Sequence, residues 1–455
     1  MNSNAISMGK DDIGKLLLRF SIPATTGMVV MATYNIVDTI FVGMLGVEAI
    51  AALSIALPFH MLLGALGNGT GIGAASLIAR SLGSGNKEIA QNTIGQIISL
   101  SIIYGFIVAL AGFYFLESFL IIFGATTEIL ALTGEYVIVI TSGSVMFFLL
   151  MGLSSALRGE GNPKLSMYVI VLSAIINIIL DPIFIFLLGM GVQGAAVATV
   201  LSKICGVIIM LYYFILGKSE SKIKPSSLLL RWNTIRKIYV IGFPAMLHSI
   251  SHNVSIIIVN NILAVYGYMA IAVFGIIFRL FTFALMPAVG ISQGLLPIIG
   301  YNHSSGQKDR IRETLIKGIQ TSTGITTFFG ILFFALPTFF VSIFSREQEV
   351  IALGSHALRI MVLMFPVIGA QIVFTVYFQA VGRGLPSLLL SILREVFFFI
   401  PFMLIISFLF GLDGVWFSRP LSDLCAFVVT LYLISCELKR QGIALLNRPL
   451  SLQSR

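Results

Sequence analysis

Long runs of apolar residues alternate with short polar segments along the whole chain. Stretches such as 100–115 and 396–410 are continuously apolar rather than alternating, which favours membrane-spanning helices over the strands of a barrel. About 20 apolar residues are needed to cross the hydrocarbon core of a bilayer. The pattern therefore predicts twelve transmembrane helices, at residues 14–44, 48–80, 92–116, 127–155, 164–189, 191–216, 237–265, 269–297, 315–337, 352–380, 387–411 and 414–437.

Composition supports an all-α integral membrane protein. Of the 455 residues, 57% are hydrophobic and only 10% are charged, whereas a soluble domain is about a quarter charged. Cys205, Cys425 and Cys436 lie in apolar segments without metal-ligand spacing, so we interpret them as small buried hydrophobic residues. The N-terminal segment is polar, and the first apolar run is expected to stay as a span rather than to be removed as a signal peptide.

Lys and Arg residues gather on one side of the predicted spans. They occur in the N-terminal segment, in the loops 80–91 and 304–317, in the segment 217–236 and in the tail, whereas the loops of the other side hold only Arg346 beside several acids. The positive-inside rule then predicts a multi-pass protein of the cell (inner) membrane with both termini in the cytoplasm. The net charge of +9 is explained by topology, and we predict no nucleic-acid partner.

The two halves of the chain repeat. Segment 49–87 aligns with segment 270–308 at a constant offset of 221 residues without a gap, and both segments end in Gly-x-Lys. Because six spans is an even number, two six-helix bundles would be related by a pseudo-two-fold axis along the membrane normal, as in alternating-access transporters. The predicted organisation is an N-lobe at 1–216, a cytoplasmic linker at 217–236, a C-lobe at 237–437 and a cytoplasmic tail at 438–455.

Two acids, Asp38 and Asp181, interrupt predicted spans of the first half. A carboxylate in the middle of a span costs roughly 2.5–3.5 kcal/mol on insertion scales. With a rise of about 1.5 Å per residue, Asp38 and Asp181 lie about 9 and 12 Å from the outer ends of their spans, and Thr199 and Tyr136 lie at similar depths. Asn177 shares a helix face with Asp181, one turn deeper. We expect these five side chains to converge, although Asn177 and Thr199 taken alone could simply hydrogen-bond between helices.

Intramembrane acids mark proton or ion paths. Burial and mutual repulsion would keep at least one of the two acids able to take up and release a proton near neutral pH. Oxygen ligands from Asp, Asn and Thr would equally suit Na⁺, so the residues leave H⁺ and Na⁺ open. Lys203, one turn beyond Thr199, is a candidate counter-ion. Pro23 and Pro182 lie in the two acid-bearing spans, as static bends or as a kink that moves with titration.

The second half carries different polar residues. His248 and His252 lie one turn apart in a span without acids, which favours a cavity-facing polar pair over a zinc site. Charges of both signs within second-half spans predict internal ion pairing, at Arg279, Arg359, Arg394, Glu395, Arg419 and Asp423. The chain contains neither a GxxxxGK[ST] loop nor an HExxH motif, so an ATP-driven pump and an intramembrane metalloenzyme are both disfavoured. No enzyme activity and no cofactor besides a coupling ion are expected.

Several motifs together point to one family. They are Pro23, VDTIFVG at 37–43, the small-residue run GNGTGIGAASLIARSLGSGN in the second span, ALRGEGNPK before the fifth, IINIILDP within it and GVQGAAVAT opening the sixth. With these motifs the chain resembles, over essentially its whole length, the multidrug and toxic compound extrusion (MATE) transporters, and within them the DinF-like branch.

The resemblance implies export of drugs or metabolites by antiport with H⁺ or Na⁺. In the DinF-like branch the first-half cation site matches Asp38, Asn177, Asp181 and Thr199 here, with Tyr136 beside them, and the substrate cavity would take in Tyr34 and Met61. The NorM-like branch places acids in spans 7 and 10. The corresponding spans 237–265 and 352–380 contain no acid, so no second-half coupling site of that type is expected.

The leading hypothesis is therefore a cation-coupled multidrug efflux antiporter that exports cationic or polyaromatic compounds by alternating access. The expected partners are small-molecule drugs or metabolites and membrane lipid, and a monomer is expected. A near alternative is a flippase or exporter of a lipid-linked or endogenous metabolite. Such flippases tend toward a cation-lined cavity, which the acidic first half does not match. An intramembrane enzyme with His248 and His252 as metal ligands would be revealed by metal analysis of the purified protein.

Overall fold

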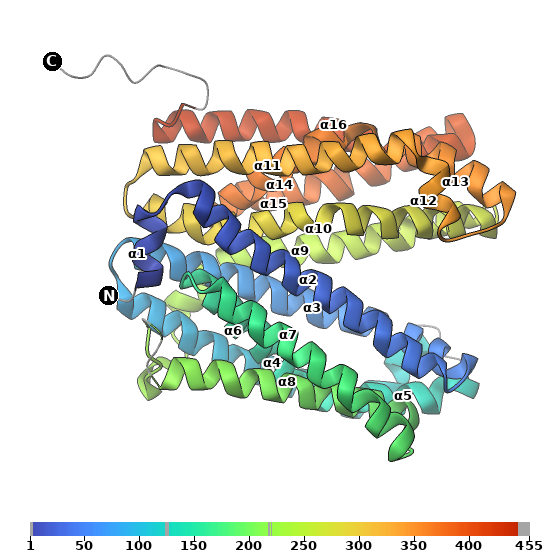
Figure 1. Cartoon of the computed structure of the whole chain (residues 1–455), viewed down its shortest axis with the longest axis horizontal. Coiled ribbons are helices and arrows are strands. Elements are labelled where there is room, and N and C mark those ends of the chain that lie inside the picture. Colours follow the sequence, from blue (N-terminus) through green and yellow to red (C-terminus); the bar gives the residue numbers. More distant parts are fainter. Residues whose placement is uncertain (1–2, 123–126, 217–218, 220, 445–455) are drawn as a thin grey trace. The chain divides into compact units, whose positions relative to one another are not determined.

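The computed structural model describes residues 3–122, 127–216, 219 and 221–444, so that part of the predicted tail, from residue 445 on, lies outside the described residues. Helices dominate, and no strand occurs within the described ranges. Helices of the first half are α1 (Ser3–Lys10), α2 (Ile13–Gly43), α3 (Val47–Gly83), α4 (Lys87–Ile122), α5 (Thr127–Ser142), α6 (Ser144–Gly159), α7 (Pro163–Pro182), the π-helix η1 (Ile183–Leu187) and α8 (Gly191–Ile215) (Figure 1). The predicted all-α class is confirmed.

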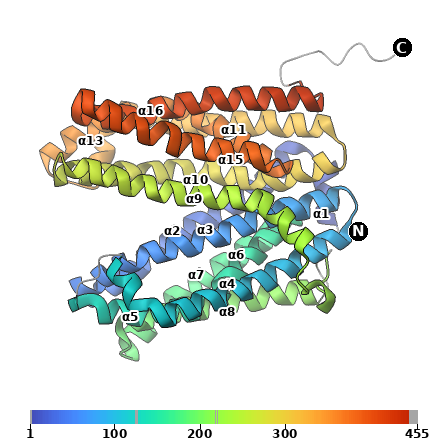
Figure 2. The ribbon, with the colours of Figure 1, turned by 180° about the vertical axis from the view of Figure 1, so that it is seen from behind.

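The remaining helices follow α8, and the first of them lies within the segment that joins the halves. They are η2 (Pro225–Ser227), α9 (Trp232–Ala264), α10 (Tyr268–Ser304), α11 (Lys308–Ala335), α12 (Pro337–Ser342), α13 (Gln348–Met361), η3 (Val362–Met364), α14 (Phe365–Ala380), α15 (Gly384–Ile392), the π-helix η4 (Leu393–Phe399) and α16 (Ile400–Gln441). Figure 2 shows the ribbon from behind, where α9, α15 and α16 can be followed.

The number of helices agrees with the predicted membrane topology. Ten helices of the described chain are long and apolar enough to cross a membrane, or eleven if α5 and α6, bent by 51°, form one span. The last of these covers 58 residues, Gly384–Gln441, or about 87 Å of helix, far more than a bilayer's hydrocarbon core of about 30 Å. Gly411 breaks it with φ 61° and ψ −139°. Counting α5 and α6 as one span and dividing this helix at Gly411 gives twelve spans, the predicted number.

Glycines with positive φ mark the same turns in both halves. Gly85 and Gly306, at φ 77° and 76°, follow the second predicted span of each half, and Gly161 and Gly382, at 88° and 81°, follow the fourth. The members of each pair are 221 residues apart, the offset of the sequence repeat. Residues that carry a Cβ rarely adopt such φ values, which explains the glycines. The turns are therefore repeated both in sequence and in backbone conformation.

The chain forms two compact units, and their boundaries fall inside helices α1, α2 and α9. The first unit holds Met1–Met8 and Ile22–Met246, and the second holds Gly9–Ser21 and Leu247–Arg455. In the first unit α3 packs on α4 and α6, and α7 packs on α8. In the second unit α10, α11 and α14 pack on one another around a buried apolar cluster that includes Phe333, Phe365 and Trp416.

The segment joining the two halves is docked on α4 within the first unit. The side-chain amide of Gln96 donates to the carbonyls of Ser227 and Leu229 at 3.0 and 2.9 Å, and its Oε1 accepts from the backbone N–H of Arg231 at 2.9 Å. Gly95, beside it, lies so close to the Ser227 carbonyl that a Cβ would collide with it. The buried side chain of Gln96 thereby forms hydrogen bonds with backbone groups that are not paired within a helix.

Candidate functional site

Asp38 is buried near the C-terminal end of a membrane-spanning helix. It lies on α2 with 7% of its surface exposed, and its Oδ1 has no hydrogen-bond partner among the described residues. A buried polar atom without a partner is costly and is uncommon in native structures. The long apolar sequence of α2 dictates a helix, and that helix places the carboxylate where neither bulk water nor a neighbouring donor satisfies Oδ1.

Asp181 is held by an amide on its own helix. Asn177, four residues earlier on α7, donates from Nδ2 to Oδ1 of Asp181 at 3.1 Å and to Oγ1 of Thr199 on α8 at 3.3 Å. Residues four apart share a helix face, so this contact follows from the sequence spacing. All three side chains are buried, and Asp181 is fully so. Oδ2 of Asp181 and Oδ1 of Asn177 have no partner.

The helix changes form directly after the second acid. Pro182 ends α7, and the next five residues, Ile183–Leu187, form the π-helix η1. Proline lacks a backbone N–H, which removes one α-helical hydrogen bond at this level. Single-turn π-helices are frequent at functional sites. Pro23, by contrast, lies fifteen residues before Asp38, or about 22 Å along α2, so it is not part of this cluster.

A cation and aromatic rings surround the acids. The charge of Lys203, on α8, acts on both Asp38 and Asp181, and its Nζ lies 5.8 Å from the centroid of the Phe147 ring on α6. Tyr136, on α5, is buried and lies in the electrostatic field of both acids. The candidate counter-ion of the sequence analysis therefore lies where it can interact with both carboxylates.

The two predicted substrate-cavity residues differ in their relation to this cluster. Tyr34, on α2, lies in the field of both Asp38 and Asp181, whereas Met61, on α3, is 46% exposed. His60, beside Met61, was not singled out from the sequence. Its ring centroid lies 5.9 Å from that of Tyr136. A lone histidine in an apolar span offers no signal of which helix it faces, so sequence alone could not have placed it.

The donor set of this cluster fits a proton or a hard cation. Two carboxylates, an amide oxygen and a hydroxyl are the oxygen ligands that Na⁺ accepts, and a carboxylate is the group that takes up a proton. Three of these oxygens are buried without a partner, on Asp38, Asn177 and Asp181. Among the described residues, no group of three or more His, Cys, Asp and Glu side chains could hold a metal ion.

The charges of the second half form a separate network. Arg394 donates from Nε to Oδ1 of Asp423 at 2.9 Å, and Nη1 of Arg419 lies 3.2 Å from Oε2 of Glu395. Nδ1 of His252 lies 3.7 Å from Oε1 of Glu395. The predicted internal ion pairing is thereby confirmed for these four charges. Of the predicted cavity-facing histidines, His252 lines a cavity, while Nδ1 of His248 is buried without a partner.

Many membrane-spanning helices, a twice-repeated fold and buried intramembrane acids define a multi-pass membrane transporter of two-unit, all-α architecture. The MatE family model matches the chain twice, over residues 23–183 and 244–405, and the two matches begin 221 residues apart, at the offset of the repeat. These matches cover more than half of the chain. The protein belongs to the MatE family, the MATE transporters.

Curated relatives and solved structures agree with this assignment. The chain is 32% identical over 429 residues to the multidrug export protein MepA of Staphylococcus aureus, covering 93% of this chain and 94% of the relative. MepA of Staphylococcus saprophyticus is 31% identical, with the same coverage. A solved structure described as the outward-facing conformation of a multidrug resistance MATE family transporter of the MOP superfamily has a TM-score of 0.91 at 26% identity, covering 98% of this chain and 100% of its own.

Proposed function

We propose that this protein is a cation-coupled multidrug efflux antiporter of the cell membrane, with both termini in the cytoplasm. Membership of the MatE family and the similarity to proteins named multidrug exporters support the export of small molecules. The observation that carries the coupling is the trio of buried, unpartnered oxygens on Asp38, Asn177 and Asp181. The positive-inside bias of the loops supports the orientation.

The chemistry of the cluster suggests how an ion gradient would be used. With both carboxylates charged, Lys203 is the cation that acts on them within the described part of the chain, and a second positive charge is favoured in a region of low dielectric. H⁺ or Na⁺ entering from outside would bind between Asp38 and Asp181 and neutralise the pair. If one conformational state of the protein binds this cation more tightly than the other, cation binding increases the population of that state, to an extent set by the ratio of the two affinities. Cation binding would thereby bias the two states of alternating access.

Exchange follows if substrate and cation compete. Polyaromatic cations are attracted to charged carboxylates and to aromatic faces, and Tyr34 on α2 lies in the field of both acids. Neutralising Asp38 removes part of this attraction, so that the substrate would leave as the coupling ion binds. Because both halves of the repeat are present in one chain, we propose that a monomer is the transport unit.

A cellular assay tests this proposal. Cells that express the wild type should retain less ethidium than cells with an empty vector, whereas cells that express Asp38→Asn at the same membrane level should retain as much as the empty-vector cells. Asp413→Asn is the matched control, because Asp413 is half-exposed and pairs with His356 outside the cluster. Full efflux by Asp38→Asn would exclude Asp38 as the coupling residue.

A further inference from the structure

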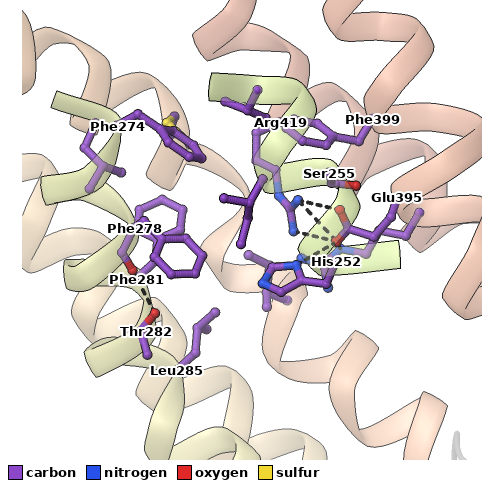
Figure 3. Close-up of a pocket in the computed structure, with 16 residues that line it drawn as sticks. His252, Ser255, Phe274, Phe278, Phe281, Thr282, Leu285, Glu395, Phe399 and Arg419 are labelled. Carbon is purple, nitrogen blue, oxygen red and sulfur yellow. Dashed lines mark hydrogen bonds and ion pairs between the residues drawn. The ribbon is translucent and has the colours of Figure 1, made fainter. Parts of the chain in front are cut away.

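The second unit contains a cavity of its own, distant in sequence from the acid cluster. Its volume is about 110 Å³, and it is lined from α9, α10, α13, α14, η4 and α16. Figure 3 shows Phe274, Phe278 and Phe281 on one side of this space, and Arg419, Glu395 and His252 on the other. The cavity is thus apolar and aromatic along one wall and charged along the opposite wall.

The charged wall holds Arg394, Arg419 and Glu395, and both arginines are also paired with Asp423, which does not line the cavity. Glu395 and Asp423 are each 1% exposed, whereas Arg394 and Arg419 are 15% and 14% exposed. Of the two acids, Glu395 lines the cavity beside both arginines, and Asp423 does not. His252 is 41% exposed and contacts the same Glu395. The hydrogen-bond donors of this wall are thus more exposed than its carboxylates.

The donors of this wall also outnumber its acceptors. A guanidinium has roughly five N–H donors, and a carboxylate offers roughly four acceptor sites. Two arginines and the ring of His252 together bring about eleven donors, against about eight acceptor sites on Glu395 and Asp423. The hydroxyl of Ser255, which is 2% exposed and lines the cavity, has no hydrogen-bond partner. Oδ2 of Asp423 is also without a hydrogen-bond partner among the described residues, but Asp423 does not line the cavity, so the cavity face itself presents more donors than acceptors.

The aromatic groups are arranged to receive a flat ring. The ring of His252 stacks on Phe278 at 6.0 Å with an interplanar angle of 27°, and the guanidinium of Arg419 lies 4.9 Å from the Phe399 ring centroid. Aromatic rings gain from stacked and edge-to-face contacts beyond their area burial. Flat faces next to hydrogen-bond donors are the recognition elements of an aromatic compound with a polar end.

The local backbone singles out the same place. Arg394, Glu395 and Phe399 all lie on the π-helix η4, and all three line the cavity. Single π-helical turns are rare and are frequently found at functional sites. The chain has a second such segment, η1, directly after Asp181. The irregular turn and the polar wall are two independent observations on one site.

We propose that this cavity is a second binding site, contained within the second unit, for planar aromatic compounds that carry a carboxylate. The carboxylate would accept from Arg394, Arg419 and His252, and the ring would lie against Phe278 and Phe281. The four fixed charges cancel, so an entering anion meets no net repulsion, and charged donors make the strongest hydrogen bonds with carboxylates. The site stands on geometry that is independent of the coupling at Asp38.

Direct binding to the full-length protein in lipid nanodiscs tests the proposal. The probes are 2-naphthoate and 2-naphthylmethylamine, which share a ring and differ in the charge of the side group, with protein-free nanodiscs as the blank. We expect saturable calorimetric binding of the naphthoate and at least tenfold weaker binding of the amine. Equal or tighter binding of the amine, or no saturable binding of the naphthoate, would overturn the proposal.

Variants locate the bound probe. His252→Ala removes an exposed donor and leaves the arginine–carboxylate pairs intact, so the dissociation constant for naphthoate should rise at least tenfold. His248→Ala is the matched control, since His248 lies one turn away on α9 but does not line the cavity; it should bind within twofold of the wild type. Phe278→Leu, which keeps an apolar side chain but loses the flat face, should weaken binding by several-fold.

Two results would reject this location. Wild-type affinity in both His252→Ala and Phe278→Leu would show that the probe binds elsewhere. Loss of affinity in Asp38→Asn, with no loss in His252→Ala, would place the probe at the acid cluster instead. Gel filtration and the thermal midpoint of each variant establish that it is folded, and because two variants of different chemistry are used, failure of one to fold leaves the other as the test.

Discussion

The side-chain amide of Asn177 donates to the carboxylate of Asp181 and to the hydroxyl of Thr199. One buried amide therefore fixes an acid on α7 and a hydroxyl on α8 in a single arrangement. The amide's own oxygen is left without a partner, as is Oδ2 of Asp181. A side chain that orders two neighbours and keeps its acceptor unpaired is suited to hold a cation beside them.

Removing this amide should impair transport more than removing the hydroxyl. Asn177→Ala leaves Asp181 and Thr199 without their shared donor, and a buried hydrogen bond to a charged group is worth about 1.5–3 kcal/mol. We expect the rate of ion-driven drug uptake into proteoliposomes to fall at least tenfold. Thr199→Val should lower the rate only a few-fold. A larger effect of Thr199→Val than of Asn177→Ala would show that the amide does not organise the cluster.

Lys203 should set how strongly the cluster attracts its coupling ion. Its charge acts on both acids, and a like charge near a cation site weakens cation binding. Lys203→Met should therefore lower the coupling-ion concentration at half-maximal transport by about tenfold, or about 1.4 kcal/mol in binding free energy. Lys203→Arg, which keeps the charge, should remain within a few-fold of the wild type. An unchanged half-maximal concentration in Lys203→Met would mean that the lysine is electrostatically silent.

Two glycine-to-alanine substitutions should differ in their effect on stability. At Gly95 a Cβ would collide with the Ser227 carbonyl of the docked segment, whereas at Gly324, in the interior of α11, it would meet nothing within 4 Å. Overpacking costs about 1–3 kcal/mol, while replacing glycine in an open helical position stabilises by about 0.4–1 kcal/mol. Thermal unfolding followed by tryptophan fluorescence should show a lower midpoint for Gly95→Ala and an equal or higher one for Gly324→Ala. The reverse order would contradict the docked position of the segment.

The buried ion network of the second unit should be sensitive to the loss of a single acid. Asp423→Asn leaves Arg394 and Arg419 short of one negative charge, and breaking a buried pair costs about 3–5 kcal/mol. The matched variant, Asp413→Asn, disrupts a half-exposed pair with His356, which is worth about 0–1 kcal/mol. We expect a clearly lower thermal midpoint and a lower yield of folded protein for Asp423→Asn only. Similar stability of the two variants would argue against a tightly paired network.

The sequence predicted the helical class and the position of the turns because both depend on local patterns. Apolar runs set the spans, and glycines such as Gly85 and Gly306 set the turns that follow them. The closeness of Asn177 to Asp181 could also be predicted, since residues four apart share a face. Contacts between helices could not be predicted in this way. The approach of His60 to Tyr136 depends on how α3 and α5 rotate against each other, which hydropathy does not encode.

The second unit illustrates the same limit. Opposite charges in its spans predicted ion pairs, but not that Arg394 would pair with Asp423 and Arg419 with Glu395. The π-helix η4 changes the direction in which successive side chains point within a continuous helical pattern. Amino-acid composition does not predict where such a π-helix occurs. That His252 lines a cavity while His248 does not is likewise a result of three-dimensional packing.

The central claim is that Asp38 and Asp181 couple export to a cation gradient. It is tested most directly by uptake of a fluorescent cationic drug into proteoliposomes, with a pH gradient and a Na⁺ gradient imposed separately. We predict that one of the two gradients drives uptake by the wild type and by Asp413→Asn, and that neither drives uptake by Asp38→Asn or Asp181→Asn. Wild-type uptake by both of these variants under the effective gradient would contradict the account.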